Sequence, residues 1–283
     1  MASRLLLCTD LDRTLLPNGT QPESPGGRGL FARLARRAEV TLAYVTGRHR
    51  ALVEKAIAIY QLPLPDFVIA DVGSTVYQVN AGHWSHWGDW EREISSDWSG
   101  RSAADLKALF SDLQPLRLQE VSKQNVHKLS YYVSLHSDSE ALQSAMQSRL
   151  QAAGIRASLI WSVDEPAGIG LLDVLPETAT KRHAIEFLME RNGFDLESTV
   201  FAGDSGNDLP VLISDIQAVL VANGGEEVRR AALAGAARAG LGHRLYLAQG
   251  GFRGMNGNYS AGIVEGVVHY LPEAERWLED GDE

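Results

Sequence analysis

The stretch LLLCTDLDRTLL, residues 5–16, begins as a run of apolar residues and ends in carboxylates and a turn. A short continuous apolar run is typical of a strand in a parallel sheet, because helices cover both faces of such a strand. We therefore predict a buried parallel strand that ends in these carboxylates. In sheets of this kind the chemistry lies at the carboxyl ends of the strands, which makes Asp10 and Asp12 candidate functional residues.

The residues that follow alternate between helix and strand patterns. Helical spacing of Leu30, Leu34 and Ala38 precedes VTLAYVTGR, residues 40–48, which has the pattern of a second buried strand. DFVIADVGSTVYQV, residues 66–79, indicates a third strand with a Gly-Ser-Thr loop. The predicted fold class is α/β, with a doubly wound parallel sheet of the Rossmann-like type.

The pattern is interrupted in the middle of the chain. Residues 83–100 are aromatic and irregular, and two later segments alternate like half-solvated strands. LLDVLP, residues 171–176, then returns to the buried-strand pattern. The predicted division is a discontinuous core of residues 1–82 and 175–283, with residues 83–174 inserted as an α+β domain.

Charge and cysteine content exclude several classes of function. The chain has 283 residues, and its 36 acidic and 26 basic side chains give a net charge of −10. This charge disfavours nucleic acid as a partner, because phosphate neutralisation needs basic residues. The single cysteine, Cys8, excludes an intramolecular disulfide and a zinc site of several thiolates. We expect a cytoplasmic protein, with no targeting or membrane segment and no membrane partner.

A second group of carboxylates follows a later strand pattern. STVFAGDSGND, residues 198–208, reads as a buried strand that runs into a loop with Asp204 and Asp208. If this loop lies beside Asp10 and Asp12, four carboxylates converge. Such a concentration of negative charge is unfavourable without a cation or a proton, and Mg²⁺ prefers oxygen ligands of this kind.

Two further residues suit a phosphoryl group. Thr46 ends the second predicted strand, and Lys181 at a helix start offers a cation to a phosphoryl oxygen. Each motif alone is also typical of a turn, a helix cap or a solvated charge. Their common position at strand exits in an alternating β/α pattern favours one shared active site.

The motifs together resemble those of the haloacid dehalogenase superfamily of phosphotransferases. The resemblance rests on DLDRT at residues 10–14, VTGR with Thr46, Lys181, and GDSGND at residues 203–208. Within that superfamily the chain resembles the sucrose-6-phosphate phosphatase group. The segments that carry this closer resemblance are residues 73–75, 124–133, 171–181 and 258–270.

The resemblance implies a role for each core residue. Asp10 would be the nucleophile that forms an aspartyl-phosphate, and Asp12 would be the general acid and base. Thr46, Gly47 and Lys181 would bind the phosphate. The implied cofactor is Mg²⁺, with Asp10, Asp12 and Asp204 as its ligands, Asp12 through its backbone carbonyl. Support of the metal shell would come from Asn207 and Asp208.

The resemblance also makes the inserted domain a cap that specifies the substrate. The implied contacts to the sugar are Arg48, Gln124, Asn125, His127 and Lys128. A solvated edge strand is the alternative for the last four. For Trp84, Trp87 and Trp90 we favour packing between cap and core over stacking on sugar rings.

Two departures from the family pattern leave the sugar open. Arg13 replaces a small polar residue of many relatives and can pair with nearby carboxylates. VDEPAGIGLLDVLP, residues 163–176, is longer than we expect for sucrose-phosphate phosphatases.

The predicted function is hydrolysis of a sugar-phosphate monoester, with sucrose 6-phosphate or a related disaccharide or glycoside phosphate as substrate. A phosphomannomutase-like mutase would use the same aspartyl-phosphate. A third hypothesis is a non-catalytic sugar-phosphate-binding partner of a glycosyltransferase. The glycosyltransferase that makes the substrate is also a possible partner of the enzyme.

Overall fold

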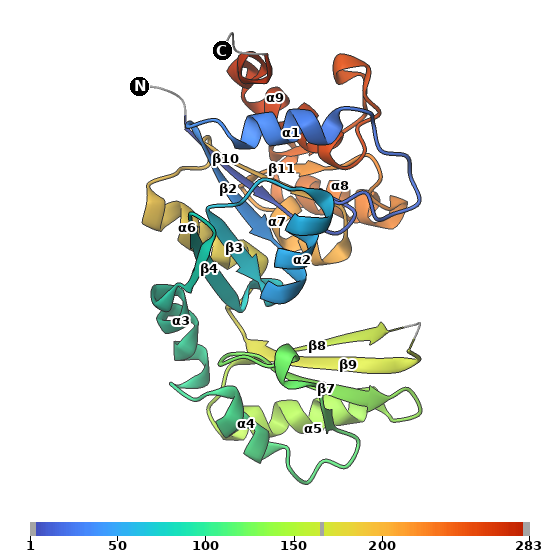
Figure 1. Ribbon diagram of the computed structural model, residues 1–283. Helices are drawn as coiled ribbons and strands as arrows, with labels where there is room; N and C mark the ends of the chain where they lie inside the picture. Colours follow the sequence, from blue (N-terminus) through green and yellow to red (C-terminus); the bar gives the residue numbers. More distant parts are fainter. Residues whose placement is uncertain (1–3, 165–166, 280–283) are drawn as a thin grey trace.

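The computed structural model describes residues 4–164 and 167–279 of the chain. Two sheets organise this part of the chain (Figure 1). The large sheet has eight strands in the order β12-β11-β10-β1-β2-β3-β4-β5. Its strands are β1 (Leu5–Thr9), β2 (Val40–Val45), β3 (Phe67–Ala70), β4 (Thr75–Asn80), β5 (His83–His86), β10 (Thr199–Gly203), β11 (Gln217–Leu220) and β12 (Leu245–Leu247).

The first strand lies in the middle of the parallel part of this sheet. β1 pairs in parallel with β2 on one side and with β10 on the other, and all of its residues are buried. Leu5 and Leu7 pack into the apolar cluster on one face of the sheet, and Leu6 and Cys8 pack into the cluster on the other face. This arrangement confirms the predicted doubly wound sheet, to which β4 and β5 add antiparallel strands.

Helices cover both faces of the large sheet (Figure 1). The helices on one face are α1 (Gly27–Ala35), α2 (Arg50–Tyr60) and α9 (Ser260–Tyr270). The helices on the other face are α3 (Gly88–Ser95), α6 (Lys181–Asn192), α7 (Leu209–Leu212) and α8 (Glu226–Ala239).

The small sheet is antiparallel and has four strands in the order β6-β7-β9-β8. These strands are β6 (Arg117–Leu118), β7 (Leu129–Ser134), β8 (Ala157–Asp164) and β9 (Ile169–Pro176). Two helices, α4 (Ala103–Leu109) and α5 (Ser139–Ala152), pack on the face that points away from the large sheet (Figure 1). The opposite face points toward the large sheet.

The change in packing falls later than the predicted boundary at residue 83. β5 pairs with β4 in the large sheet, and Trp90 and Ile94 of α3 belong to an apolar cluster of that sheet. The cluster of the small sheet begins at Trp98. The aromatic character of residues 83–95 therefore reflects packing against the large sheet. We call residues 98–176 the small unit and the remaining residues the large unit.

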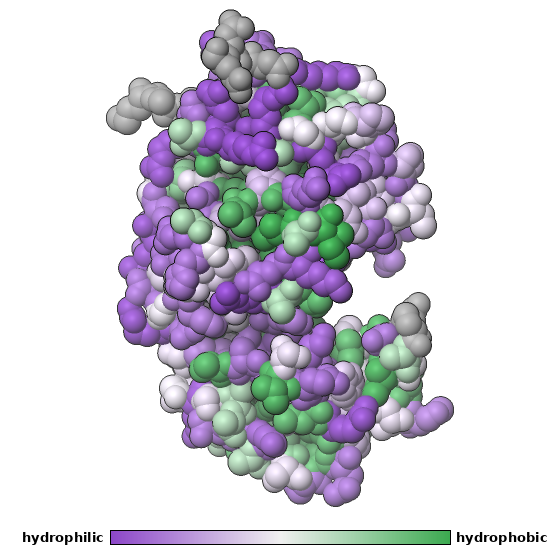
Figure 2. Space-filling model, viewed as in Figure 1, coloured by the Kyte–Doolittle hydropathy of each residue, from purple (hydrophilic) through white to green (hydrophobic). Residues whose placement is uncertain are grey.

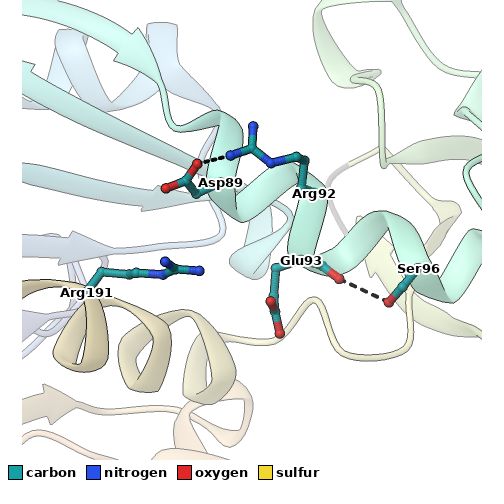
Figure 3. Close-up of a pocket in the computed structure, with 5 residues that line it drawn as sticks. All are labelled: Asp89, Arg92, Glu93, Ser96 and Arg191. Carbon is teal, nitrogen blue, oxygen red and sulfur yellow. Dashed lines mark hydrogen bonds and ion pairs between the residues drawn. The ribbon is translucent and has the colours of Figure 1, made fainter.

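The two connections between the units are tied together at one buried carboxylate. Asp97 lies where the chain enters the small unit, and Thr178 lies where it returns. The backbone N–H and the hydroxyl of Thr178 donate to Asp97 Oδ2 at 2.6 and 2.7 Å, and Arg156 pairs with the same carboxylate. Beside the first connection, α3 and α6 flank a polar hollow of about 360 Å³ (Figure 3). Its lining residues are Asp89, Arg92, Glu93, Ser96 and Arg191.

Two further predictions concern the long stretch before α6 and the absence of a membrane segment. Within the stretch of residues 163–176, the first two residues end β8 and residues 169–176 form β9, while residues 165–166 lie outside the described residues. Among the described helices, none combines the length and the apolar character that a membrane span requires.

Candidate active site

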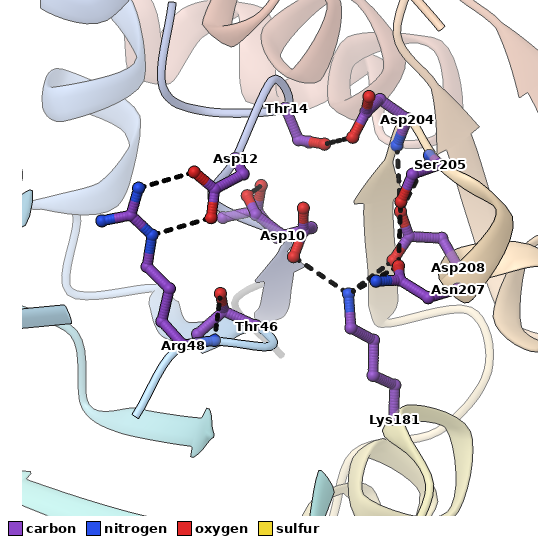
Figure 4. Close-up of polar contacts among 11 residues, drawn as sticks. Asp10, Asp12, Thr14, Thr46, Arg48, Lys181, Asp204, Ser205, Asn207 and Asp208 are labelled. Carbon is purple, nitrogen blue, oxygen red and sulfur yellow. Dashed lines mark hydrogen bonds and ion pairs between the residues drawn. The ribbon is translucent and has the colours of Figure 1, made fainter. Parts of the chain in front are cut away.

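The parallel strands bring the predicted motifs to one edge of the large sheet (Figure 4). Asp10 follows β1, Thr46 follows β2 and Asp204 follows β10, and these three strands are neighbours. Lys181 enters from the first residue of α6, where the side chain of Thr180 caps the helix by accepting the backbone N–H of His183 at 3.1 Å. The four sequence motifs, far apart along the chain, therefore meet in one place.

Lys181 lies between two carboxylates at the centre of the site. Its Nζ donates to Asp10 Oδ1 at 2.9 Å, to Asp208 Oδ1 at 2.7 Å and to Asn207 Oδ1 at 3.2 Å. Burial favours the neutral amine, but the charges of Asp10 and Asp208 outweigh it, and the pKa of Lys181 is raised. The lysine is thus a fixed positive charge.

Asp10 is buried, and its surroundings act on its pKa in opposite directions. Burial raises the pKa most, the charge of Lys181 lowers it, and the neighbouring Asp208 raises it again. The balance raises the pKa of Asp10 to about 7. Additional positive charge in the site would lower this pKa and favour the ionised carboxylate.

A cluster of three buried carboxylates provides a place for that charge. Ligand oxygens of Asp10, Asp204 and Asp208 lie within 4.8 Å of one another. Burial, and then the charge of Asp208, raise the pKa of Asp204 to about 6. Hard oxygen donors that repel one another fit a small divalent cation such as Mg²⁺.

Residues of the first motif fix Asp204 from the side of β1. Thr14 Oγ1 donates to Asp204 Oδ1 at 3.0 Å, and Arg13 Nε lies 3.4 Å from Asp204 Oδ2. Arg13 therefore pairs with a carboxylate of the cluster, as its position next to the motif suggested. The role of Thr14 was missed from the sequence, although its place at the end of DLDRT is a usable signal.

Asp12 is held by Arg48, the arginine of the VTGR motif (Figure 4). Arg48 Nε and Nη2 donate to Asp12 Oδ2 and Oδ1 at 2.7 and 2.6 Å, and Asn18 Nδ2 donates to Asp12 Oδ1 at 2.7 Å. Although burial raises the pKa of Asp12, these donors outweigh it and the pKa is lowered. Asn18 lies four residues after the DLDRT motif and was not predicted as a site residue, because no sequence signal marks it.

The loop after β10 is ordered by its own carboxylate. The backbone N–H groups of Asp204 and Ser205 both donate to Asp208 Oδ2 at 3.1 Å, while Asn207 Oδ1 accepts from Ser205 Oγ at 2.8 Å. Asp208 therefore shapes the loop with one oxygen and binds Lys181 with the other. Ser205 was not singled out from the sequence.

The groups around Asp10 open onto two cavities. The first, of about 310 Å³, is lined by Asp10, Asp12, Arg13, Gly47, Arg48, Leu52, Asp204, Ser205 and Asn207. The second, of about 290 Å³, lies between the two units and is lined by Val72, Ser158, Ile160, Leu175, Ala179, Thr180, Lys181, Asn207 and Pro210. Because Asn207 lines both, the cavities adjoin at the site. Figure 2 shows the surface hollowed between the units.

The four predicted residues of the small unit have protein partners. Gln124 Nε2 donates to the backbone carbonyls of Gln119 and Ser130 at 3.2 and 2.9 Å, and the ring of His127 packs edge-on against Trp98. Asn125 and Lys128 reach across to the large unit. Contact of these four residues with a sugar stays a prediction.

The tryptophans of the interrupted region pack inside the large unit. Trp84 contacts Tyr77, Trp87 stacks on Phe67, and Trp90 is fully buried. They belong to the packing of the large unit.

Comparison with known proteins agrees with this arrangement. Residues 3–271 match the sucrose-6F-phosphate phosphohydrolase family. A HAD-like hydrolase of Nitrosococcus oceani is 58% identical over 285 residues, which cover 100% of this chain and 76% of that protein. A probable sucrose-phosphatase 2 of Arabidopsis thaliana is 29% identical, over 80% of this chain and 52% of that protein.

The fold has a counterpart among solved structures. The sucrose-phosphatase of Synechocystis sp. PCC6803, solved in complex with sucrose and phosphate, superimposes with a TM-score of 0.68 at 24% identity. The match covers 95% of this chain and 98% of that one. The chain is therefore a phosphoric monoester hydrolase of the haloacid dehalogenase superfamily, and it belongs to the sucrose-6F-phosphate phosphohydrolase family.

Proposed function

We propose that the protein is a Mg²⁺-dependent phosphatase that hydrolyses a sugar-phosphate monoester through an aspartyl-phosphate on Asp10. One observation carries the proposal: Asp10 is a buried carboxylate that contacts the charged Lys181 and lies in the same cavity as Asp12. This arrangement supplies a nucleophile in Asp10 and, two residues further on in Asp12, a group that can move a proton to the leaving oxygen and from the attacking water.

The first step is an in-line attack of an Asp10 oxygen on phosphorus. A new bond joins Asp10 to phosphorus while the bond from phosphorus to the sugar oxygen breaks, and the sugar oxygen takes a proton from Asp12. In the second step a water molecule attacks the phosphorus and gives a proton to Asp12. The Asp10 carboxylate is then regenerated and inorganic phosphate leaves.

The surrounding residues bind the phosphoryl oxygens and the cation. Thr46, Gly47 and Lys181 hold phosphoryl oxygens as negative charge shifts onto them. Asp10, Asp204 and the backbone carbonyl of Asp12 would hold a Mg²⁺ ion, whose charge would screen the repulsion between carboxylate and phosphate. Asn207 and Asp208 hold Lys181 beside these groups, because both accept a hydrogen bond from its Nζ.

Arg48 has to change partners during the reaction. Both oxygens of Asp12 are occupied by Arg48 in the structure, and this contact holds the pKa of Asp12 low. Asp12 can carry a proton to the leaving group only if Arg48 releases one of these oxygens. We propose that the bound substrate contacts the Arg48 guanidinium, which then moves away from Asp12.

The leaving group is proposed to extend into the cavity between the units, with the small unit acting as a cap. Sucrose 6-phosphate or a related disaccharide or glycoside phosphate is the proposed substrate. This choice is supported by the family match and by the relatives named above. A glycosyltransferase that makes such an ester remains a proposed partner.

Phosphate release from a panel of esters tests the proposal. The panel contains sucrose 6-phosphate, mannosylfructose phosphate, glucosylglycerate phosphate and simple hexose phosphates. We expect release that requires Mg²⁺, is lost with EDTA and falls about a thousandfold or more in Asp10→Asn, since a nucleophile is removed. Asp112→Asn is the matched control, because Asp112 pairs with Arg149 at the surface of the small unit.

Two outcomes would overturn the proposal in favour of the alternatives. An isomerised sugar phosphate without free phosphate would indicate a mutase. Tight binding of an ester without turnover across the panel would indicate a non-catalytic binding partner.

A further inference from the structure

A strained turn after β3 lies between the two units. The backbone angle φ is 51° at Asp71, 60° at Val72 and 106° at Gly73. Two consecutive non-glycine residues with positive φ cost free energy, and such conformations persist only where the surroundings hold them. The turn contributes no atom to the catalytic groups described above.

On the side of the large unit, this turn contacts both phosphate-binding segments. The backbone N–H of Asp71 donates to the carbonyl of Arg48, and that of Val72 donates to the carbonyl of Thr46, each at 3.1 Å. Gly73 packs so closely on the start of α6 that a Cβ there would lie 2.5 Å from the carbonyl carbon of Thr180 and 2.9 Å from the nitrogen of Lys181. The turn thus links the VTGR loop to the lysine helix.

On the other side, two residues of the small unit hold the side chain of Asp71. Lys128 Nζ donates to Asp71 Oδ1 at 3.3 Å, and Asn125 Nδ2 lies 3.4 Å from Asp71 Oδ2. Asn125 Nδ2 also reaches Ser74 Oγ at 3.3 Å and Thr75 Oγ1 at 3.0 Å. Asp71 and Lys128 are only 6% and 7% exposed.

The local backbone aims these two side chains the same way. Asn125 and Lys128 exchange backbone hydrogen bonds of 3.1 and 3.4 Å, which closes a tight turn before β7. On the small unit, Lys128 Nζ also lies 3.7 Å from Asp173 Oδ2. A buried ion pair of this kind adds little stability compared with apolar packing, because both charges lose their hydration. Its effect is to fix one relative position of the two units.

We propose that Asp71 is a positioning residue, through which the docked small unit holds Thr46 and Lys181 in the geometry that binds the phosphoryl group. The inference rests on the function proposed above. It assigns to the Gly-Ser-Thr loop at residues 73–75 and to residues 124–128 a role that does not require contact with a sugar.

Inhibition by orthovanadate separates this role from sugar binding. Vanadate resembles the phosphoryl group in transfer and carries no sugar, so a residue that only contacts the sugar does not affect its binding. The variants are Asp71→Asn, which keeps the shape of the side chain, and Lys128→Met, which removes the charge from the small unit. Arg149→Met is the control, because it breaks the ion pair with Asp112 inside the small unit.

We expect vanadate inhibition to weaken about tenfold in Asp71→Asn and in Lys128→Met, within the range measured for residues that act through others. Vanadate inhibition of the double variant should be no weaker than that of the more affected single variant, because both substitutions break the same contact. Vanadate should inhibit the Arg149→Met variant as strongly as it inhibits the wild type. Circular dichroism and thermal unfolding verify that each variant is folded at the assay temperature.

Two results would overturn the inference. One is wild-type vanadate inhibition in a folded Lys128→Met variant, which tests the contact even if Asp71→Asn does not fold. The other is additive losses in the double variant. A wild-type protein that releases no phosphate from any ester would instead refute the proposed function, so the two failures are distinguishable.

Discussion

Asp10 and Asp204 illustrate how burial and charge oppose each other at single residues. Both carboxyls are almost inaccessible to solvent, and burial is the main cause of their raised pKa values of about 7 and about 6. Lys181 offsets only part of the cost of ionising these two carboxyls. Under the proposed function, this cost in stability of the metal-free protein is the counterpart of affinity toward Mg²⁺.

The substitution Asp204→Asn tests how the buried carboxyl affects the stability of the metal-free protein. In the metal-free protein the folded state binds the Asp204 proton more tightly than the unfolded state, so the free energy of unfolding falls as pH rises from about 4 to about 6. Asparagine cannot ionise, so that decline should be smaller. We expect the variant to be more stable by on the order of 1 kcal/mol at pH 8 in EDTA, yet nearly inactive with Mg²⁺.

Urea unfolding between pH 4 and pH 8 in EDTA measures the effect. The Asp112→Asn protein provides the comparison for loss of a surface carboxylate. Unchanged pH dependence in Asp204→Asn would contradict the electrostatic account of this carboxyl.

Among contacts between elements, that of Gly73 is the closest-packed one described above, because this glycine packs the turn η1 (Asp71–Gly73) against the start of α6. Its φ of 106° and its contact with the backbone of Thr180 leave no room for a side chain. Backbone atoms of a helix start cannot move aside as a flexible side chain can. The start of α6, which carries Lys181, is therefore fixed by the turn.

Gly73→Ala should destabilise the protein by roughly 2–4 kcal/mol, from the sum of strain and overpacking. Gly100→Ala is the control, since Gly100 also has a positive φ, of 74°, but no atom within 4 Å of its Cβ position. Thermal unfolding of the two variants separates the steric contact from the backbone strain. Equal destabilisation would contradict the close packing of the turn on α6.

For the molecule as a whole, local patterns in the sequence predicted the parallel sheet and the motifs at its strand ends. Continuous apolar runs identify β1, β2 and β10 because buried parallel strands need apolar residues on both faces. The order of the motifs then predicts the site, because adjacent parallel strands end at one edge. These inferences need no knowledge of contacts between distant residues.

The contacts between the units could not be predicted in the same way. Nothing in the residues around Trp90 shows which apolar cluster it joins, so the predicted boundary fell at residue 83 and not near Trp98. The partners of Asn125 lie 50 to 54 residues away along the chain, and its polarity suits a sugar as well as a protein partner. Tertiary packing decides such cases, and the local sequence does not encode it.

The proposed activity requires that Asp10 receive a phosphoryl group from a sugar phosphate. Rapid acid quenching during turnover of sucrose 6-phosphate, or of the most active ester in the panel, should preserve an acyl phosphate. Borohydride reduction of that acyl phosphate converts the modified aspartate to homoserine, which peptide mass spectrometry can locate. We predict homoserine at position 10, and none in metal-free protein. Turnover without any label at position 10, or with the label at another residue, would contradict the account.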